Sequence, residues 1–309
     1  MTPQDDYLWD GSGPVDPGVA ELEALLAPLR YAGAPPAPPK QAPGWMGLAL
    51  AAGILLAFSS LLFQNPDEPG ITEGWVVESL AGAALCDSDT CSLGVGEWLE
   101  TGADGRARLE VADIGEMELG PHTRLRLKAT GPQEHRLELA RGRVEAFVIA
   151  PPRLLIVETP AATAVDLGCA YTLEVDDDGD GVLTVTSGWV ALEAPAGDVL
   201  VPRGATARMT SGHGPGIPRF TDAPPALVRG LDAMEAGRAV PLAPLLKHAR
   251  PRDTLSLWHL LQLQQGDARA QILDRIIELV GEPLPERSAV LAGDADAMRL
   301  LQDQLTLDW

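Results

Sequence analysis

Positive charge is scarce in this 309-residue sequence, in which 23 lysines and arginines stand against 44 aspartates and glutamates for a formal net charge of −21. Nucleic acids and anionic lipid headgroups are bound by clustered lysine and arginine, so the chain as a whole is not expected to bind either. Aromatic residues make up only 5% of the chain, whereas 32 glycines and 27 prolines indicate many turns.

Catalytic signatures are missing as well. The five histidines are scattered, and neither His-Glu-x-x-His nor Gly-x-Ser-x-Gly occurs. Around His213 the string MTSGHG lacks the first glycine of a nucleophile elbow, and Gly94 and Gly96 lack the rest of a nucleotide-binding fingerprint. We therefore expect no enzymatic activity, no catalytic residue and no cofactor.

Only three cysteines are present. Cys86 and Cys91 bracket the loop CDSDTC, and a local disulfide is favoured there because close thiols are oxidised outside the cytoplasm. The alternative is metal binding by both thiolates with Asp87 and Asp89, although no second Cys or His pair is nearby. Cys169 lies in an apolar run and is expected to be a small buried side chain.

Charge is absent altogether from residues 41–66, and residues 45–63 are almost continuously apolar. As a helix these 19 residues reach about 28 Å, close to the roughly 30 Å core of a bilayer. The stretch therefore predicts one transmembrane helix. A signal peptide would begin near residue 1 with basic residues, and a buried helix of a soluble core is usually shorter, so both alternatives fit less well.

The flanking basic residues predict the orientation. Arg30 and Lys40 precede the apolar stretch, and the next lysine or arginine is Arg106. Because positive charge stays on the cytoplasmic side, we expect a single-pass inner-membrane protein with a cytoplasmic N-terminus and a periplasmic or extracytoplasmic C-terminal domain.

Residues 1–31 form the predicted cytoplasmic arm, and the proline-rich residues 32–44 form an extended linker. Between Val19 and Leu29 apolar residues recur at the spacing of one short helix, which is marginal in water by itself. Its partner is either the segment at residues 6–11 (DYLWDG), in a hairpin without a binding role, or another protein. In the second case the partner-binding residues would be Trp9, Leu22, Leu25, Leu26 and Leu29.

Residues 75–212 alternate between apolar and polar, as in RARLEV at 106–111 and at 123–127, 136–139 and 181–185, which predicts a mainly β domain of short strands. LELARGRV and LTVTSGWV share one template, with Gly142 and Gly188 in the same slot 46 residues apart, and a looser copy contains Gly204. Such recurrence favours a β-solenoid or roll. Equivalent hairpins of a sandwich are the alternative.

The acidic run at residues 176–181 (DDDGDG) has Asp176, Asp178, Asp180 and Gly181 at positions 1, 3, 5 and 6 of a calcium loop, but Ser187 at the twelfth. A solvated hairpin turn is favoured over calcium binding, so no metal site is predicted.

Residues 224–309 change to a helical period. Helices are predicted over 226–236, 254–264, 268–280 and 295–305, with Asp253 and Asp267 as N-caps and Gly281 as a C-cap. We expect a small helical bundle or hairpin appended to the β domain.

The run at residues 153–175 (RLLIVETPAATAVDLGCAYTLEV), followed by VLTVTSGWVALE and LVPRGATARM, resembles the FecR-type family of single-pass membrane regulators of extracytoplasmic-function sigma factors. The departures are Ala162 for glycine, Cys169 for threonine and Ala170-Tyr171 for x-Phe. The resemblance covers about residues 75–210. Matching positions are Val157, Thr159, Pro160, Leu167, Gly168, Tyr171, Leu173, Gly188, Val190 and Gly204.

This resemblance implies a transmembrane signal-transducing regulator, of the anti-sigma or sigma-regulator type, that couples an extracytoplasmic β sensor domain to a cytoplasmic sigma factor. An envelope or outer-membrane signalling protein would then supply the signal. The alternative is a structural or glycan-binding module of the cell envelope with a passive membrane anchor.

Overall fold

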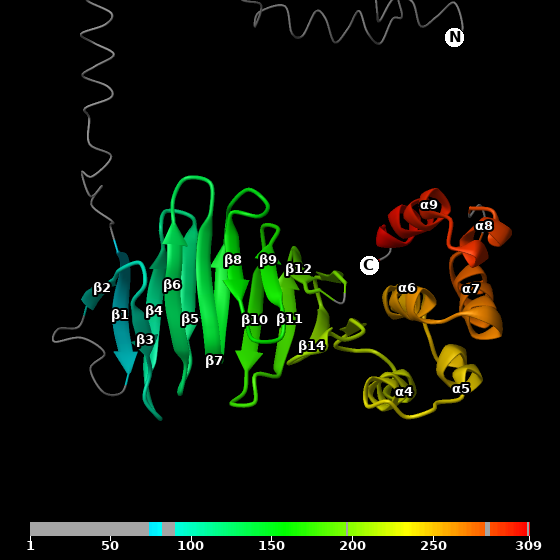
Figure 1. Ribbon diagram of the computed structural model, residues 1–309, viewed down its shortest axis with the longest axis horizontal. Helices are drawn as coiled ribbons and strands as arrows, with labels where there is room; N and C mark the ends of the chain where they lie inside the picture. The colour runs from blue at the N-terminus through cyan, green and yellow to red at the C-terminus, as the bar shows by residue number, and fades with distance from the viewer. Residues whose placement is uncertain (1–73, 82–89, 196, 282–284, 308) are drawn as a thin grey trace, which may run out of the picture. The chain divides into compact units, whose positions relative to one another are not determined.

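The computed structural model describes residues 74–81, 90–195, 197–281, 285–307 and 309 (Figure 1). They belong to one compact unit, residues 69–309. The predicted arm, linker and membrane helix lie outside the described residues. Among the helices that are described, none combines the length and the apolar character needed to cross a bilayer, so the membrane helix of the predicted fold class is not part of the described structure.

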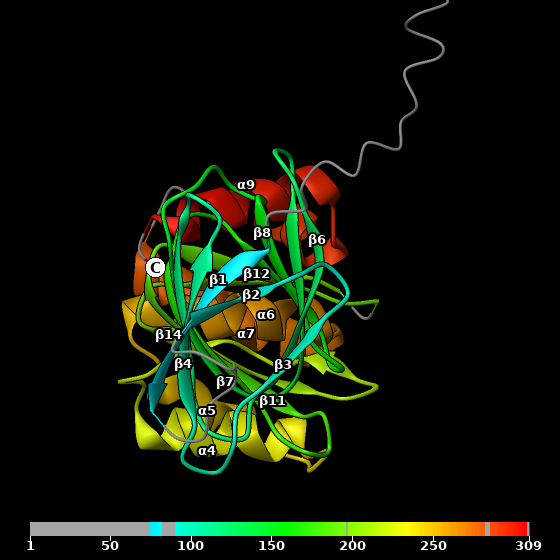
Figure 2. The ribbon, with the colours of Figure 1, turned by 90° about the vertical axis from the view of Figure 1, so that its left-hand side faces the viewer.

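The β domain consists of two sheets that share one long strand, β7 (His135–Val148). Sheet A contains β1 (Trp75–Ala81), β2 (Thr90–Leu93), β4 (Arg106–Val111), β5 (Gly115–Leu119), β10 (Ala170–Val175), β11 (Gly181–Ser187), β14 (Ala205–Thr210), β15 (Gly214–Pro215) and β16 (Arg219–Phe220). Sheet B contains β3 (Trp98–Glu100), β6 (Arg124–Thr130), β8 (Leu155–Glu158), β9 (Thr163–Asp166), β12 (Trp189–Glu193) and β13 (Val199–Pro202). Figure 2 looks along the row of strands and shows the two layers.

Strand β7 changes sheets at Gly142. Before this residue it pairs with β6 and β8 in sheet B, and from this residue on it pairs with β5 and β10 in sheet A. Gly142 has φ 98°, and a Cβ there would lie 2.2 Å from the Cα of Thr123. Only glycine fits this corner, because any larger residue would meet both backbone strain and a backbone clash.

The other glycines of the sequence repeat are corners too. Gly188 (φ 69°) separates β11 in sheet A from β12 in sheet B, and Gly204 (φ 78°) separates β13 in sheet B from β14 in sheet A. The repeated template therefore marks the places where the chain passes between layers.

The prediction of a β-solenoid or roll is wrong. A solenoid stacks successive rungs as parallel neighbours, whereas the described strands pair antiparallel, with β7 and β8 as the parallel pair among them. The domain is a two-layer sandwich of hairpins, the alternative that the sequence repeat also allowed. Local glycine spacing is the same in both folds, and only the pairing between distant strands distinguishes them.

The sandwich core lies between the two sheets. Inward positions alternate with outward ones along each strand, as in β4, where Ala107, Leu109 and Val111 are buried. Besides Phe220 and Met117, the core contains many fully buried leucines from both sheets, and each contributes about 1.5–3 kcal/mol relative to an exposed position. They include Leu109, Leu119, Leu125, Leu127, Leu137, Leu139, Leu173 and Leu183.

The C-terminal region is helical, and Figure 1 shows it at the end of the strand row next to β14. The four predicted helices are present with ends within two residues of those expected. Gly281 (φ 81°) is the C-cap of α7 as predicted, but α7 begins after Gln265 and not at Asp267. The helical elements are α4 (Pro225–Glu235), α5 (Leu242–Lys247), η2 (Pro251–Asp253), α6 (Thr254–Leu263), α7 (Gly266–Val280), α8 (Arg287–Ala292) and α9 (Ala295–Thr306).

The helices enclose a second core, which includes Leu231, Leu260, Ile276 and Leu301. Leu255, in the first turn of α6, belongs to the sandwich core instead. Because one helix contributes to both cores, the helical region is packed onto the sandwich by apolar contacts as well as by the polar contacts described below.

Candidate functional site

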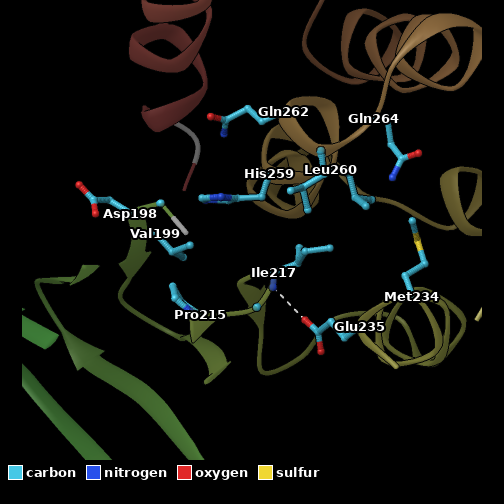
Figure 3. Close-up of a pocket in the computed structure, with 13 residues that line it drawn as sticks. Asp198, Val199, Pro215, Ile217, Met234, Glu235, His259, Leu260, Gln262 and Gln264 are labelled. Atoms are coloured by element: carbon cyan, nitrogen blue, oxygen red, sulfur yellow. Dashed lines mark hydrogen bonds between the residues drawn. The ribbon is translucent and has the colours of Figure 1, made fainter. Parts of the chain in front are cut away.

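A cleft of about 450 Å³ lies where the sandwich meets the helices (Figure 3). One wall comes from residues 197–199 at the start of β13 and from residues 215–217 between β15 and β16. The other wall comes from the end of α4 and the second half of α6, residues 259–264. The cleft thus exists only because the two parts of the chain pack together.

His259 lies in the α6 wall of this cleft, and in Figure 3 its ring extends toward Asp198 and Val199. The side chain is 9% exposed, and its Nε2 atom is buried without a hydrogen-bond partner among the described residues. Burial lowers the pKa of His259 to about 4, so the imidazole is neutral near pH 7. A neutral imidazole keeps one N–H donor and one acceptor nitrogen.

The rest of the lining combines aliphatic side chains with carboxylates and with the amides of Gln262 and Gln264. Val199, Ile217 and Leu260 are buried, and Leu263 stands at the mouth with 67% of its surface exposed. The lining residues include neither lysine nor arginine. Its carboxylates are Asp198, which is exposed, and Glu235, whose oxygens accept hydrogen bonds from other parts of the protein.

Arg219, in β16, connects the sandwich to α4. Its side chain is 5% exposed and donates from Nη1 to Asp232 Oδ1 at 2.5 Å and from Nη2 to Glu235 Oε2 at 2.7 Å. Glu235 Oε1 also accepts a hydrogen bond from the backbone N–H of Ile217 at 2.8 Å. A buried guanidinium is tolerated only when its charge is compensated, so these acids must stay in place for β16 and α4 to pack.

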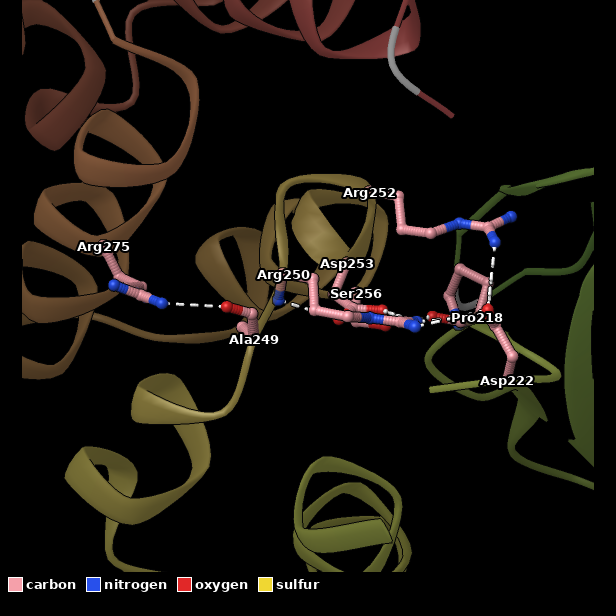
Figure 4. Close-up of polar contacts among 8 residues, drawn as sticks. All are labelled: Pro218, Asp222, Ala249, Arg250, Arg252, Asp253, Ser256 and Arg275. Carbon is pink, nitrogen blue, oxygen red and sulfur yellow. Dashed lines mark hydrogen bonds and ion pairs between the residues drawn. The ribbon is translucent and has the colours of Figure 1, made fainter. Parts of the chain in front are cut away.

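A second polar cluster connects the same segment to η2 and α6 (Figure 4). Asp253 is fully buried and accepts hydrogen bonds from the backbone N–H of Arg250 at 2.8 Å, from Nε at 2.8 Å and from Nη2 at 3.0 Å. The Arg250 guanidinium also reaches Asp222, which follows β16. Hydrogen bonds first to Asp253 and then to Asp222 raise the pKa of Arg250.

Two further contacts strengthen this connection. The Arg252 guanidinium lies 3.7 Å above the ring of Phe220, a cation–π contact, and Ser256 Oγ donates to the carbonyl of Pro218 at 2.7 Å. Asp253 occupies the N-cap position of α6, as predicted, but its side chain makes no cap hydrogen bond to that helix and binds Arg250 instead. Residues 218–222 therefore form the connecting segment between the sandwich and the helices.

Asp166, Cys169 and Tyr171 form a buried group at the corner between β9 and β10. Asp166 accepts hydrogen bonds from the Gly168 N–H at 2.6 Å and from Cys169 Sγ at 2.7 Å. Burial raises the pKa of both the Asp166 carboxyl and the Cys169 thiol. Cys169 is free and buried, in agreement with the expectation of a small buried side chain.

Comparison with known families identifies most of the sandwich. Residues 97–191 match the model of the family described as FecR protein. This part of the chain is a FecR domain. The resemblance found in the sequence is confirmed, and the Asp166 corner, Gly142 and Gly188 all lie inside the FecR domain. The cleft and the helical region lie beyond residue 191, outside the match.

Two solved structures are similar to part of the chain. Both are crystal structures, at 1.65 and 2.50 Å, of a protein from Parabacteroides distasonis ATCC 8503 that is provisionally described as an anti-sigma factor. Each is 16% identical to this chain, with a TM-score of 0.37. The matches cover 49% of this chain, and 72% and 71% of the two solved chains. No curated protein matches the chain.

The predicted partner-binding residues Trp9, Leu22, Leu25, Leu26 and Leu29 all lie outside the described residues, so their role stays a prediction. Cys91 is disulfide-bonded. Cys86 also lies outside the described residues, so the pairing itself stays a prediction.

The acidic run at residues 176–181 is the turn of the β10–β11 hairpin in the FecR domain. Asp176 Oδ1 accepts hydrogen bonds from the backbone N–H groups of Asp178 and Asp180, and Asp180 Oδ1 accepts one from Ser211. These carboxylates organise the turn. In the described part of the chain, no group of three or more His, Cys, Asp or Glu side chains is arranged to hold a metal ion.

Sequence reasoning missed the residues that build the cleft and the connecting segment at 218–222. His259 carried one usable signal, because it interrupts the apolar run LSLWHLLQL. Arg219 carried none, since its acidic partners are 13 and 16 residues away on another element.

Proposed function

We propose that this protein regulates a sigma factor from the inner membrane. Its N-terminal arm would hold or license the sigma factor in the cytoplasm, while the FecR domain and the helices packed on it would receive a signal from an envelope or outer-membrane protein on the other side. The FecR match at residues 97–191 carries this proposal, because it agrees with the resemblance of the sequence to the FecR-type regulators of extracytoplasmic-function sigma factors.

Two features of the sequence support the proposed topology. The uncharged residues 41–66 separate a short arm from residues 69–309, and the arm contains apolar residues at helical spacing that need a partner. We propose that this partner is the sigma factor.

The contacts between the sandwich and the helices support a regulatory role for this part of the chain. Arg219 connects the sandwich to α4 through Asp232 and Glu235. Asp253 binds Arg250, whose guanidinium also contacts Asp222 after β16. Such contacts couple the two packed parts, so a change in one part would alter the packing of the other.

Co-purification of a sigma factor with the full chain tests the proposal. The double substitution Leu22→Asp and Leu26→Asp places two charges in the apolar stripe of the arm and is expected to abolish co-purification. Ala20→Asp and Ala24→Asp adds the same charges at the same spacing on the opposite helical face and is expected to preserve it.

The proposal fails if the wild-type chain retains no sigma factor, or if both double variants lose it equally. If the protein were instead a structural or glycan-binding envelope module, deleting residues 1–31 would impair envelope integrity without changing transcription.

A further inference from the structure

The cleft between the sandwich and the helices has the properties of a small-molecule site. Its volume of about 450 Å³ is within the range of roughly 300–1,000 Å³ that is typical of such sites. Its buried lining residues other than His259 are aliphatic, and polar groups occur at a few further positions, as in sites that bind a mainly apolar molecule and orient it by hydrogen bonds.

His259 supplies the polar group that lacks a partner. A buried polar atom is normally hydrogen-bonded, yet Nε2 of this side chain has no partner among the described residues. The ring lies in the wall of the cleft, as Figure 3 shows, so a molecule in the cleft is in a position to provide the missing hydrogen bond.

The charges around the cleft restrict the chemistry of this molecule. No lysine or arginine lines the cleft, whereas Asp198 and Glu235 do, which disfavours an anion. The Glu235 carboxylate is already bound to Arg219 and Ile217, so the buried side chain of the lining that lacks a hydrogen-bond partner at one of its polar atoms is His259. A hydroxyl group both donates and accepts, and it therefore suits either tautomer of a neutral histidine.

We propose that this cleft binds an uncharged, mainly apolar molecule whose hydroxyl group hydrogen-bonds to Nε2 of His259. Because both walls contact the molecule, binding would stabilise the packing of the helices on the sandwich. The inference does not depend on the proposed sigma-factor role, since the cleft lies outside the FecR match and is complete within residues 197–264.

Titration of the full-length protein with 2-naphthol tests the proposal, with the signal of protein-free buffer, including any detergent, subtracted. Saturable binding is expected. Naphthalene-2-sulfonate, an anion on the same ring system, is expected to bind at least tenfold more weakly, and 2-methylnaphthalene, which lacks the hydroxyl, about three- to tenfold more weakly.

Two pairs of variants locate the site. Leu263→Trp fills the mouth of the cleft and should weaken 2-naphthol binding at least tenfold, whereas Leu300→Trp, at a 56% exposed position of α9, should leave it unchanged. His259→Leu should weaken 2-naphthol three- to tenfold without weakening 2-methylnaphthalene, and His213→Leu, at an exposed turn, should change neither.

The proposal is overturned if the wild-type protein shows no saturable binding up to the solubility limit of 2-naphthol, or if Leu263→Trp binds it as the wild type does. Equal losses of 2-naphthol and 2-methylnaphthalene in His259→Leu would also overturn it, because the histidine would then act only on the shape of the cleft. The same holds if the sulfonate binds as tightly as the naphthol.

Discussion

Asp253→Ala is expected to destabilise the described unit more than Asp222→Ala, which removes the other carboxylate bound to Arg250. The Asp253 side chain is fully buried and accepts three hydrogen bonds from Arg250, one of them from the backbone N–H. A hydrogen bond to a charged group contributes about 1.5–3 kcal/mol, although several bonds to one carboxylate do not add fully.

Relaxation of Arg250 sets the size of the effect. Its side chain is 35% exposed, so after the substitution the guanidinium regains water and keeps its contact with Asp222. The Arg250 N–H and the space left by the carboxylate have no such compensation. We therefore expect Asp253→Ala to lower the free energy of unfolding by about 2–4 kcal/mol, below the 3–5 kcal/mol typical of a fully buried pair.

Urea denaturation of the full chain, followed by far-UV circular dichroism and by tryptophan fluorescence, measures this loss. Trp258 is buried in α6, five residues after Asp253, and reports on this region. Asp222→Ala is the matched control because Asp222 binds the same guanidinium from a 57% exposed position, where an ion pair contributes little. Asp253→Asn, which keeps the volume and one acceptor oxygen, should fall between the two. Equal midpoints for Asp253→Ala and Asp222→Ala would refute the reasoning.

Two further predictions concern a sandwich corner and the buried histidine. Gly188→Ala should lower the free energy of unfolding by about 2–5 kcal/mol in thermal or urea denaturation, because its φ is 69° and the new Cβ would lie 2.2 Å from the Gly168 carbonyl oxygen. Gly212→Ala has a similar φ of 77° with no atom within 4 Å of the Cβ, so it should cost only about 1–2 kcal/mol, and equal losses would contradict the clash. His259 has its pKa lowered from 6.5 to about 4 in the folded state, so the unfolded chain binds more protons between these values and stability falls as the pH is lowered through this window. The loss approaches about 3 kcal/mol at pH 4 and should be missing from the pH profile of His259→Leu, whereas parallel profiles for the two proteins would show that the histidine is not buried.

Local patterns in the sequence were sufficient for most elements. The strand at 106–111 and the four helices follow from alternation and from helical spacing, and each of these signals lies within about a dozen residues. The FecR resemblance was likewise readable, because its pattern consists of turn and core positions along one stretch of chain. Gly281 ends α7 as predicted for the same reason, since a C-cap depends on neighbouring residues.

Pairing between distant strands could not be read in this way. The glycines at 142, 188 and 204 were visible as a repeat, but whether they were rungs of a solenoid or corners of a sandwich depended on which strands became neighbours. The cleft and the connecting segment at 218–222 depended in addition on how the helices pack on the sandwich. Arg219 and His259 acquire their roles from partners and walls on other elements, so they look ordinary in the linear sequence. Asp253 binds Arg250 three residues earlier, and Arg250 in turn contacts Asp222 of the sandwich side.

The sequence by itself determined the order of the parts: an acidic chain with an apolar stretch at 45–63, then a β domain with FecR spacing, then helices. These features are local in the chain, so composition and periodicity reveal them. Only the tertiary structure decided that the β domain is a sandwich, that residues 218–222 connect it to the helices through buried charges, and that His259 faces a cleft between them. The physical reason is that burial and charge compensation belong to pairs of surfaces, and neither surface is defined until both have folded.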